Sequence, residues 1–206
     1  MTRDITLAFD SSEPHCAVAI LDGREVLFHR VEAMTKGQAE RLPVLIETAM
    51  TEVGLAPSDL SRIGVGTGPG NFTGTRISVA LARGIALGVG IQAQGVSAIE
   101  AYGDGRDVTV CLPAPRGRVI LGHGTHIETQ GIEDAVPEGM PNRVCGPAAE
   151  DVAVATGAVL LDTPDLAPAI GLATRKGANT IGMRPAPVYL RPADAAPTSD
   201  LPPRIL

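Results

Sequence analysis

The sequence has few of the aromatic and basic residues that bind nucleic acid. It has no tryptophan, and phenylalanine and tyrosine together make up only 2% of the residues, so few side chains can stack on bases. Lysine occurs only at Lys36 and Lys176, and 17 basic residues stand against 23 acidic ones, for a net charge of −6. Because tight nucleic-acid binding draws on clustered basic side chains, the composition argues against such binding by this chain alone.

Paired cysteines and long apolar runs are also missing. Cys16, Cys111 and Cys145 are odd in number and widely spaced, and we expect them to be reduced, buried thiols of a cytoplasmic protein. The nearest approach to a membrane span is residues 77–91, which Arg83 interrupts. We therefore expect no transmembrane helix.

The first half of the chain predicts an alternation of strands and helices. Apolar runs at 5–10, 16–21 and 25–31 predict three strands, with a hairpin turn at Asp22-Gly23. A helix is expected over 38–53, since its apolar residues recur at helical spacing. Further expectations are a strand over 62–67, a helix over 75–88, a strand over 91–96 and a helix capped by Ser97.

The second half of the chain differs in composition and predicts shorter elements. A polar stretch at 103–107 predicts a hinge, which divides the chain into an N-terminal lobe, 1–103, and a reduced C-terminal lobe, 104–206. Strands are expected at 108–112 and 119–122, and short helices near 148–156 and 165–174. The proline-rich end predicts a loosely ordered tail from about residue 193.

Glycine is concentrated between a predicted strand and a predicted helix, at positions 64, 66, 68, 70 and 74. The loop lacks the lysine of a phosphate-binding Walker loop and breaks the GxGxxG dinucleotide pattern. Two interpretations remain. The loop holds an anion at the start of the helix, or it makes a tight strand-to-helix connection.

Four segments together resemble the TsaB family. They are AFDSS at 8–12, QAERLP at 38–43, GTGPGNFTGTR at 66–76 and PVYLR at 187–191. The third is the most specific, and the likeness is dense over residues 5–103. The resemblance implies an α/β fold of the actin/hexokinase/heat-shock-ATPase superfamily, with one complete N-terminal lobe and a reduced second lobe.

The same resemblance implies a function. TsaB proteins are non-catalytic subunits that support threonylcarbamoylation of the tRNA adenosine beside the anticodon. Implied partners are a TsaD-like catalytic subunit and a TsaE-like ATPase, with a homodimer when the chain is isolated and only indirect contact with tRNA. The alternative is a self-contained small ATPase or kinase of the same fold, which the length of the chain disfavours.

The first strand ends in Asp10-Ser11-Ser12, which has two interpretations. In this superfamily the position often carries an aspartate that organises a magnesium-bound nucleotide, so the three residues are candidates for a vestigial nucleotide site. The other interpretation is a turn in which Asp10 caps backbone amides. We expect no tightly bound cofactor, with ATP or ADP limited to a subunit interface.

Metal binding is not expected. The catalytic relative TsaD has two histidines four residues apart on a helix, and this chain has Ala98 and Tyr102 at the corresponding places. The pair His123 and His126 has no third ligand nearby in the sequence and is interpreted as a solvated loop.

The two long predicted helices are candidates for the partner surface, because the resemblance implies that they pair with their counterparts in the partner. Arg76 and Arg83 share a helix face. They could meet acidic residues or a nucleotide phosphate at a subunit boundary, or they could simply border solvent. The predicted interface residues are Leu42, Leu45, Ile46, Ala49, Arg76, Ile77, Ala80, Leu81 and Gly84.

Overall fold

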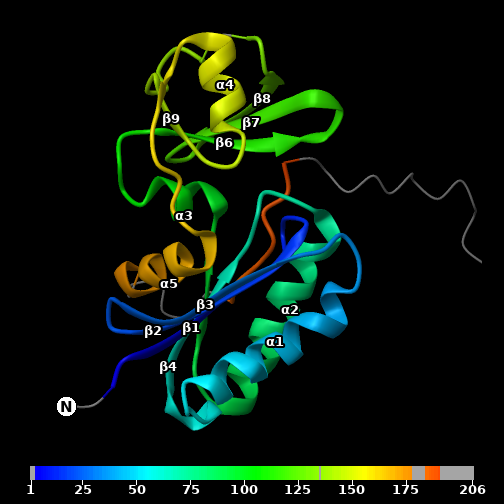
Figure 1. The fold of residues 1–206 in the computed structure, drawn as a ribbon, viewed down its shortest axis with the longest axis vertical. Coiled ribbons are helices and arrows are strands. Elements are labelled where there is room, and N and C mark those ends of the chain that lie inside the picture. Colours follow the sequence, from blue (N-terminus) through cyan, green and yellow to red (C-terminus); the bar gives the residue numbers. More distant parts are fainter. Residues whose placement is uncertain (1–2, 135, 178–183, 191–206) are drawn as a thin grey trace, which may run out of the picture.

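The computed structural model describes residues 3–134, 136–177 and 184–190. Two five-stranded sheets form two lobes, one above the other in Figure 1, and helices α3 and α5 lie between them. The predicted loose tail from residue 193, and Arg191 of the last TsaB-like segment, lie outside the described residues. Among the described residues, no helix combines the length and apolarity that crossing a bilayer requires.

The first sheet has the strand order β3-β2-β1-β4-β5. Its strands are β1 (Ile5–Asp10), β2 (His15–Asp22), β3 (Glu25–Ala33), β4 (Leu60–Gly66) and β5 (Ala93–Val96). The first three form an antiparallel meander, and β4 and β5 continue in parallel from β1. The predicted hairpin at Asp22-Gly23 is confirmed, with Gly23 at φ 61° where a side chain would be strained.

Helices cover both faces of this sheet. Helices α1 (Gln38–Glu52) and α2 (Phe72–Val89) lie on one face, and α5 (Leu166–Lys176) lies on the other (Figure 1). Helix α2 starts three residues before the predicted position, because the Asn71 side chain caps it by accepting from Thr73 N at 2.9 Å and Gly74 N at 3.0 Å.

Alternation along β1 explains why α5 can come so close. Ile5, Leu7 and Phe9 point toward α1 and α2, whereas Ala8 belongs to the cluster under α5. A Cβ on Gly171 of α5 would lie 2.4 Å from Leu21 Cδ1. Small residues on this face thus let the helix backbone approach the sheet.

The second sheet has the order β10-β9-β6-β7-β8. Its strands are β6 (Thr109–Ala114), β7 (Arg118–His123), β8 (His126–Gly131), β9 (Arg143–Cys145) and β10 (Val159–Leu160). The strands predicted at 108–112 and 119–122 are confirmed as β6 and β7, which pair antiparallel across the short 3-10 helix η2 (Pro115–Gly117). Helix α4 (Ala149–Thr156) is also confirmed.

Three strands of this sheet were not predicted. The interpretation of His123 to His126 as a solvated loop is wrong, because the two histidines pair across a two-residue turn that joins β7 to β8. Strands β9 and β10 have three and two residues, too few for an alternating pattern to register.

The chain passes between the lobes through α3 (Ala98–Gly103), which Ser97 caps as predicted by accepting from Glu100 N at 3.0 Å. The division at residue 103 remains a prediction. The change of sheet does fall just after it, but α5 of the second half returns to cover the first sheet. The remaining short element is η1 (Pro57–Asp59), which leads into β4.

Candidate functional site

The carboxyl end of β1 forms a closed turn around Asp10. The residue is only 1% exposed, and its Oδ1 accepts hydrogen bonds from Ser12 N at 2.7 Å and Ser12 Oγ at 2.9 Å. This is the turn in which Asp10 caps backbone amides, the second of the two interpretations of Asp10-Ser11-Ser12. Ser11 and Ser12 are likewise buried.

A polar cluster surrounds the same carboxylate. His15 Nε2 lies 3.3 Å from Asp10 Oδ1, and His15 Nδ1 lies 3.9 Å from Glu13 Oε2. Tyr102 of α3 donates its hydroxyl to Glu13 Oε1 at 3.0 Å. The backbone oxygen of Tyr102 also accepts from Cys145 Sγ at 3.4 Å, so this residue contacts both lobes. We call Asp10, Ser12, Glu13, His15 and Tyr102 the β1-tip cluster.

Burial and charge shift the pKa values in this cluster. Burial raises the pKa of Glu13, although His15 opposes the shift. Burial alone would lower the pKa of His15, but the hydrogen bond and charge of Asp10 outweigh it, so that the pKa lies above the usual 6.5. Burial also raises the pKa of Tyr102 and keeps its phenol neutral. The cluster therefore places the carboxyl groups of Asp10 and Glu13 around the imidazole of His15, and the neutral Tyr102 hydroxyl donates a hydrogen bond to Glu13.

Sequence reasoning missed the roles of Glu13 and His15. The signal was present, because two titratable residues directly follow the predicted turn at the end of a buried strand. For Tyr102, the resemblance implies only that it replaces a histidine. Its partner, Glu13, is 89 residues away in the chain, and no periodicity connects two such positions.

The glycine loop is a tight connection that fits against this turn. Ser11 Oγ donates to Gly74 O at 2.8 Å, and Asn71 N donates to Ser12 O at 2.6 Å. A Cβ on Gly74 would lie 1.8 Å from Ser11 O. The amides of Thr73 and Gly74, which an anion at the start of α2 would use, bond instead to the Asn71 side chain. The geometry favours the strand-to-helix connection over the anion site.

One oxygen of Asp10 has no hydrogen-bond partner. Oδ2 is fully buried, and a Cβ on Gly66 would lie 1.8 Å from it, so β4 backbone fills the adjoining space. With Oδ1 occupied by Ser12 and His15, neither carboxylate oxygen is open to a ligand in this conformation. The polar contacts at the β1 tip therefore hold the turn in place and leave no carboxylate oxygen for a ligand.

Ala98 and Tyr102, the residues expected to stand in place of two metal-binding histidines, are buried at 4% and 5% exposure. Among the described residues, no group of three or more histidine, cysteine or carboxylate side chains could hold a metal ion. The cysteines are free and buried, as predicted. Burial raises the pKa of Cys16 to about 11 and that of Cys111 to about 12, so these thiols stay protonated.

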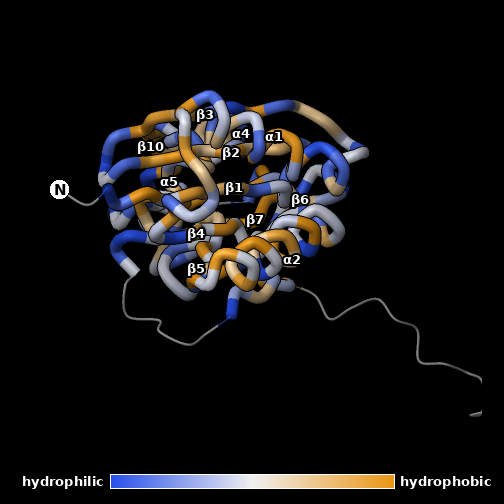
Figure 2. The backbone as a smooth tube through the Cα atoms, turned by 90° about the horizontal axis from the view of Figure 1, so that it is seen from below, coloured by the Kyte–Doolittle hydropathy of each residue, from blue (hydrophilic) through white to orange (hydrophobic). Residues whose placement is uncertain are grey.

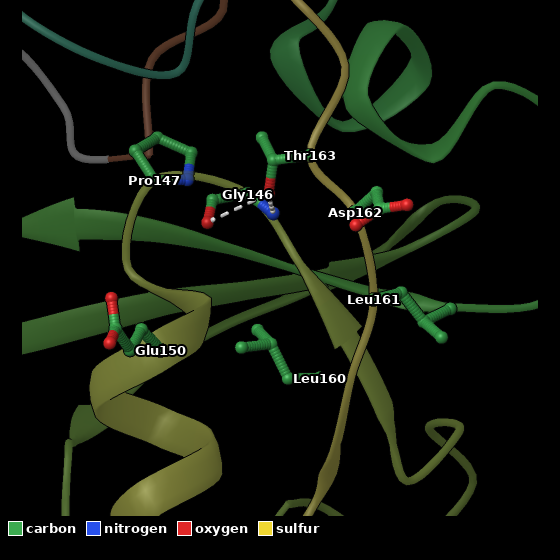
Figure 3. A pocket seen from close by; sticks show the side chains of 7 residues that line it. All are labelled: Gly146, Pro147, Glu150, Leu160, Leu161, Asp162 and Thr163. Atoms are coloured by element: carbon green, nitrogen blue, oxygen red, sulfur yellow. Dashed lines mark hydrogen bonds between the residues drawn. The ribbon is translucent and has the colours of Figure 1, made fainter.

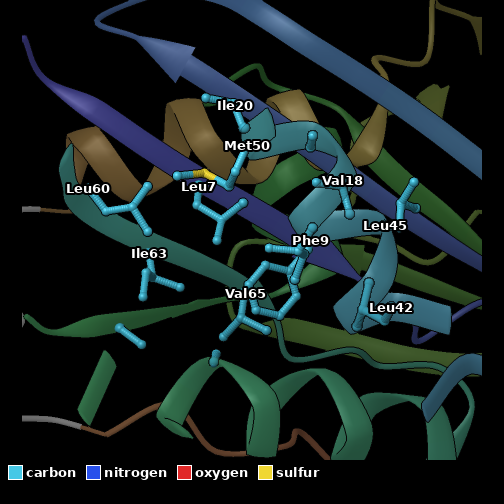
Figure 4. Close-up of a cluster of buried hydrophobic side chains, with 14 of the residues drawn as sticks. Leu7, Phe9, Val18, Ile20, Leu42, Leu45, Met50, Leu60, Ile63 and Val65 are labelled. Atoms are coloured by element: carbon cyan, nitrogen blue, oxygen red, sulfur yellow. The ribbon is translucent and has the colours of Figure 1, made fainter. Parts of the chain in front are cut away.

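The predicted partner surface needs a correction at α1. Its four members, Leu42, Leu45, Ile46 and Ala49, are at most 7% exposed and belong to the core of this chain. Figure 4 shows Leu42 and Leu45 beside Phe9 and Val18. The helical spacing of these residues was interpreted correctly, but the apolar stripe faces the chain's own sheet.

Helix α2 keeps an open face. Arg76, Ala80 and Gly84 are exposed and lie in one row at i+4 spacing, while Ile77 and Leu81 are half-buried against the core. Leu87 is 86% exposed. Gly84 and Gly88 have nothing within 4 Å of a built Cβ. In Figure 2 the helix is orange over much of its length. Its exposed residues include the apolar Ala80 and Leu87 as well as Arg76 and Arg83.

The two arginines of α2 bind a segment from the far end of the chain. We call residues 184–190 the strap. Arg83 Nη2 donates to Pro185 O, and Arg76 Nε donates to the Tyr189 hydroxyl at 2.8 Å. Val188 N donates to Thr67 O at 2.8 Å. None of the predicted roles for these arginines, which were to meet acidic residues, to meet a nucleotide phosphate or to border solvent, includes this contact within the chain.

A pocket of about 370 Å³ lies in the second lobe, where β9 leads into α4 (Figure 3). Gly146 N donates to Thr163 Oγ1 at 2.8 Å across it, and the side chains of Glu150 and Asp162 border it. Both carboxylates are exposed. The lining shows no buried polar group aimed into the space, and sequence reasoning placed no site here.

Comparison with known proteins gives relatives and a fold. The chain is 31% identical over 121 residues to the tRNA threonylcarbamoyladenosine biosynthesis protein TsaB of Bacillus subtilis, covering 56% of this chain and 53% of the relative. It is 31% identical over 99 residues to TsaB of Escherichia coli, covering 48% and 42%. The chain thus matches about half the length of these curated relatives.

A solved structure from Pseudomonas aeruginosa, described as an uncharacterized protein similar to the peptidase YeaZ, superimposes with a TM-score of 0.74 at 22% identity. The superposition covers 91% of this chain and 100% of that one, so the two chains share the predicted α/β fold.

The family model of TsaD, described as tRNA N6-adenosine threonylcarbamoyltransferase, matches residues 30–146, more than half of the 206 residues. This match extends from β3 through the glycine loop, α2 and α3 into the second sheet as far as Gly146. With the two TsaB relatives, it leads to one conclusion: the chain belongs to the TsaD family and is a TsaB-like member of it.

Proposed function

We propose that this chain is the accessory subunit of a complex that makes threonylcarbamoyladenosine in tRNA. In this role it binds a TsaD-like catalytic subunit, which transfers the threonylcarbamoyl group to the adenosine beside the anticodon, and works with a TsaE-like ATPase in the cytoplasm. The chain contacts tRNA only indirectly. The likeness to two curated TsaB proteins supports the complex, and the closed β1 tip supports a role without catalysis.

One observation carries the non-catalytic part of the proposal. Asp10 stands where an actin-like ATPase would present a carboxylate, yet its Oδ1 is bonded to Ser12 and His15 and its Oδ2 faces Gly66. A carboxylate enclosed in this way supports the β1–β2 turn. A magnesium-bound nucleotide would have to displace His15 before reaching it.

Nucleotide binding by the isolated chain is accordingly weak in this proposal. The expected dissociation constant for magnesium-ATP is on the order of 1 mM or weaker, about 4 kcal/mol of binding free energy. ATP or ADP would bind tightly only at a boundary with another subunit. Calorimetric titration of the isolated chain measures this, and micromolar affinity would contradict it.

The open face of α2 supports a partner-binding role, because an exposed apolar helix face in a chain of this size calls for a covering surface. We propose that Arg76, Ala80, Gly84 and Leu87 face the TsaD-like subunit. An isolated chain would use the same face to form a homodimer, which sedimentation at several concentrations would detect.

Reconstitution tests the function as a whole. The chain, a TsaD-like subunit and a TsaE-like ATPase from one organism are purified and incubated with tRNA, ATP and the threonylcarbamoyl adenylate. Digested tRNA is analysed by mass spectrometry for the modified nucleoside. We expect product only when this chain is present. Equal product without it, or product from this chain alone, would refute the accessory role.

A further inference from the structure

The chain's exposed aromatic residues lie together. Of its five phenylalanine and tyrosine residues, Phe9, Phe28 and Tyr102 are buried, at 8% exposure or less. The other two, Phe72 and Tyr189, are 43% and 45% exposed and have ring centroids 5.0 Å apart, although 117 positions separate them in sequence. Keeping two costly apolar rings in solvent at one place points to an interaction surface.

An arginine lies against both rings. Arg76 Cζ is 3.6 Å from the Phe72 ring centroid and 5.6 Å from that of Tyr189, and its Nε donates to the Tyr189 hydroxyl. Its two Nη groups have no acceptor among the described residues. The guanidinium is therefore fixed in orientation by two rings and one hydrogen bond, with its outer donors free.

The strap completes this surface. It brings Tyr189 to Arg76, and it adds two more exposed apolar side chains, Val188 at 37% and Leu190 at 39%. The strap is itself held by the carbonyl of Pro185 and the amide of Val188, so the aromatic group is built before any partner arrives. Preorganised aromatic and arginine side chains are the residues that carry most binding energy in protein interfaces.

The charge of the surface differs from that of the chain. Helix α2 and the strap contain Arg76, Arg83 and Arg184 and no acidic residue, in a protein of net charge −6. Such a cationic patch with an apolar border fits a protein surface that offers a carboxylate beside apolar groups. RNA is less well suited, because tight binding of a nucleic-acid backbone draws on many clustered cations and this surface has three. The adjoining row of Ala80, Gly84 and Leu87 is also apolar.

We propose that Phe72, Arg76 and Tyr189, with Val188 and Leu190, form the central docking site for the catalytic subunit of the complex. In this proposal, which rests on the proposed function, the partner inserts a carboxylate onto the Arg76 guanidinium and an apolar side chain onto the rings. The strap is then a required part of the interface, and the far end of the chain takes part in partner binding.

Titration calorimetry with the purified TsaD-like subunit of the same organism tests the proposal. Phe72→Ala and Tyr189→Ala are each expected to weaken binding about 30-fold or more. Arg76→Lys keeps the charge but loses the planar fork, and we expect a loss of about tenfold. Since these side chains are exposed, circular dichroism should show each variant folded.

Arg30→Gln is the matched control. Arg30 also lies over an aromatic ring, with Cζ 5.0 Å from the Phe28 centroid, but it pairs with Glu52 on another part of the lobe. We expect its variant to bind like the unchanged chain. A second arm titrates an anticodon stem-loop RNA into the same set of proteins.

The outcomes separate the proposals. If the unchanged chain binds the TsaD-like subunit and all three variants bind equally well, the docking site is refuted and the proposed function stands. If the unchanged chain does not bind that subunit, the proposed function fails and this inference with it. If the variants lose RNA binding and keep subunit binding, the surface is an RNA site and the docking proposal is overturned.

Discussion

The two faces of the first sheet are built for different tasks. Toward α1 and α2 the sheet presents large side chains such as Leu7 and Phe9. Toward α5 it presents small ones such as Ala8, and at its end it carries the enclosed carboxylate of Asp10. One face therefore supports a helical layer whose outer side stays open. The other closes on α5 and α3 and joins the two lobes.

Within the helical layer, α1 and α2 differ in the same way. Both carry apolar residues at helical spacing, and the sequence suggested that both meet a partner. Helix α1 is amphipathic, and its one apolar side packs against the core of this chain. Helix α2 is apolar nearly all round, so covering one side with the sheet leaves Ala80, Gly84 and Leu87 exposed.

The sharpest test places one charge on each helix. Leu45→Glu buries an unpaired carboxylate in a fully buried position and should cost more than about 4 kcal/mol, enough to unfold the chain. Leu87→Glu, on the open face, should change the free energy of unfolding by less than about 0.5 kcal/mol at a protein concentration where the chain is monomeric. Urea titration followed by circular dichroism measures both. Similar losses from the two variants would mean that α2 is buried like α1.

A second test compares two glycines of α2. Gly74→Ala forces a Cβ to within 1.8 Å of Ser11 O and should destabilise the chain by about 2 kcal/mol or more. Gly84→Ala meets nothing within 4 Å and should stabilise the isolated chain by about 1 kcal/mol, since alanine is the better helix former. The same urea titration applies. A stabilised Gly74 variant would contradict the close fit between the loop and the β1 tip.

What the sequence could reveal follows from the range of each signal. Helices α1, α2 and α5 and the strands of the first sheet were predictable, because periodicity and turn residues act over a few positions. The turn at Asp10 was one of two local interpretations, and both stayed open until His15 and Gly66 were placed. Contacts such as Tyr102 with Glu13 and Arg76 with Tyr189 join distant positions, so composition and spacing carry no trace of them.

The smallest expected effect belongs to the other face of the sheet, where the β1-tip cluster titrates. Burial raises the pKa of Glu13 above its usual 4.5, and Asp10, working against burial, raises that of His15 above 6.5. A group whose pKa is higher in the folded state contributes stability below its unfolded pKa and loses it as the pH rises through the folded value. Both groups act in this direction. The contribution of Glu13 to the free energy of unfolding should therefore fall as the pH rises above its usual pKa of 4.5, and that of His15 as the pH rises above 6.5.

The variants His15→Gln and Glu13→Gln should each lose part of this dependence on pH. The measurement is the free energy of unfolding of each variant and of the unchanged chain at several pH values, and the quantity compared is the difference between them. His126→Gln is the control, because His126 also pairs with a carboxylate, Glu128 at 2.7 Å, but does so on an exposed hairpin. It controls for the loss of a histidine outside the β1-tip cluster. If instead the unchanged chain gains stability relative to the His15 and Glu13 variants as the pH rises, the cluster does not hold its protons in the folded state. The contact between the two lobes on this face of the sheet would then depend on the packing of Tyr102 and α5 alone.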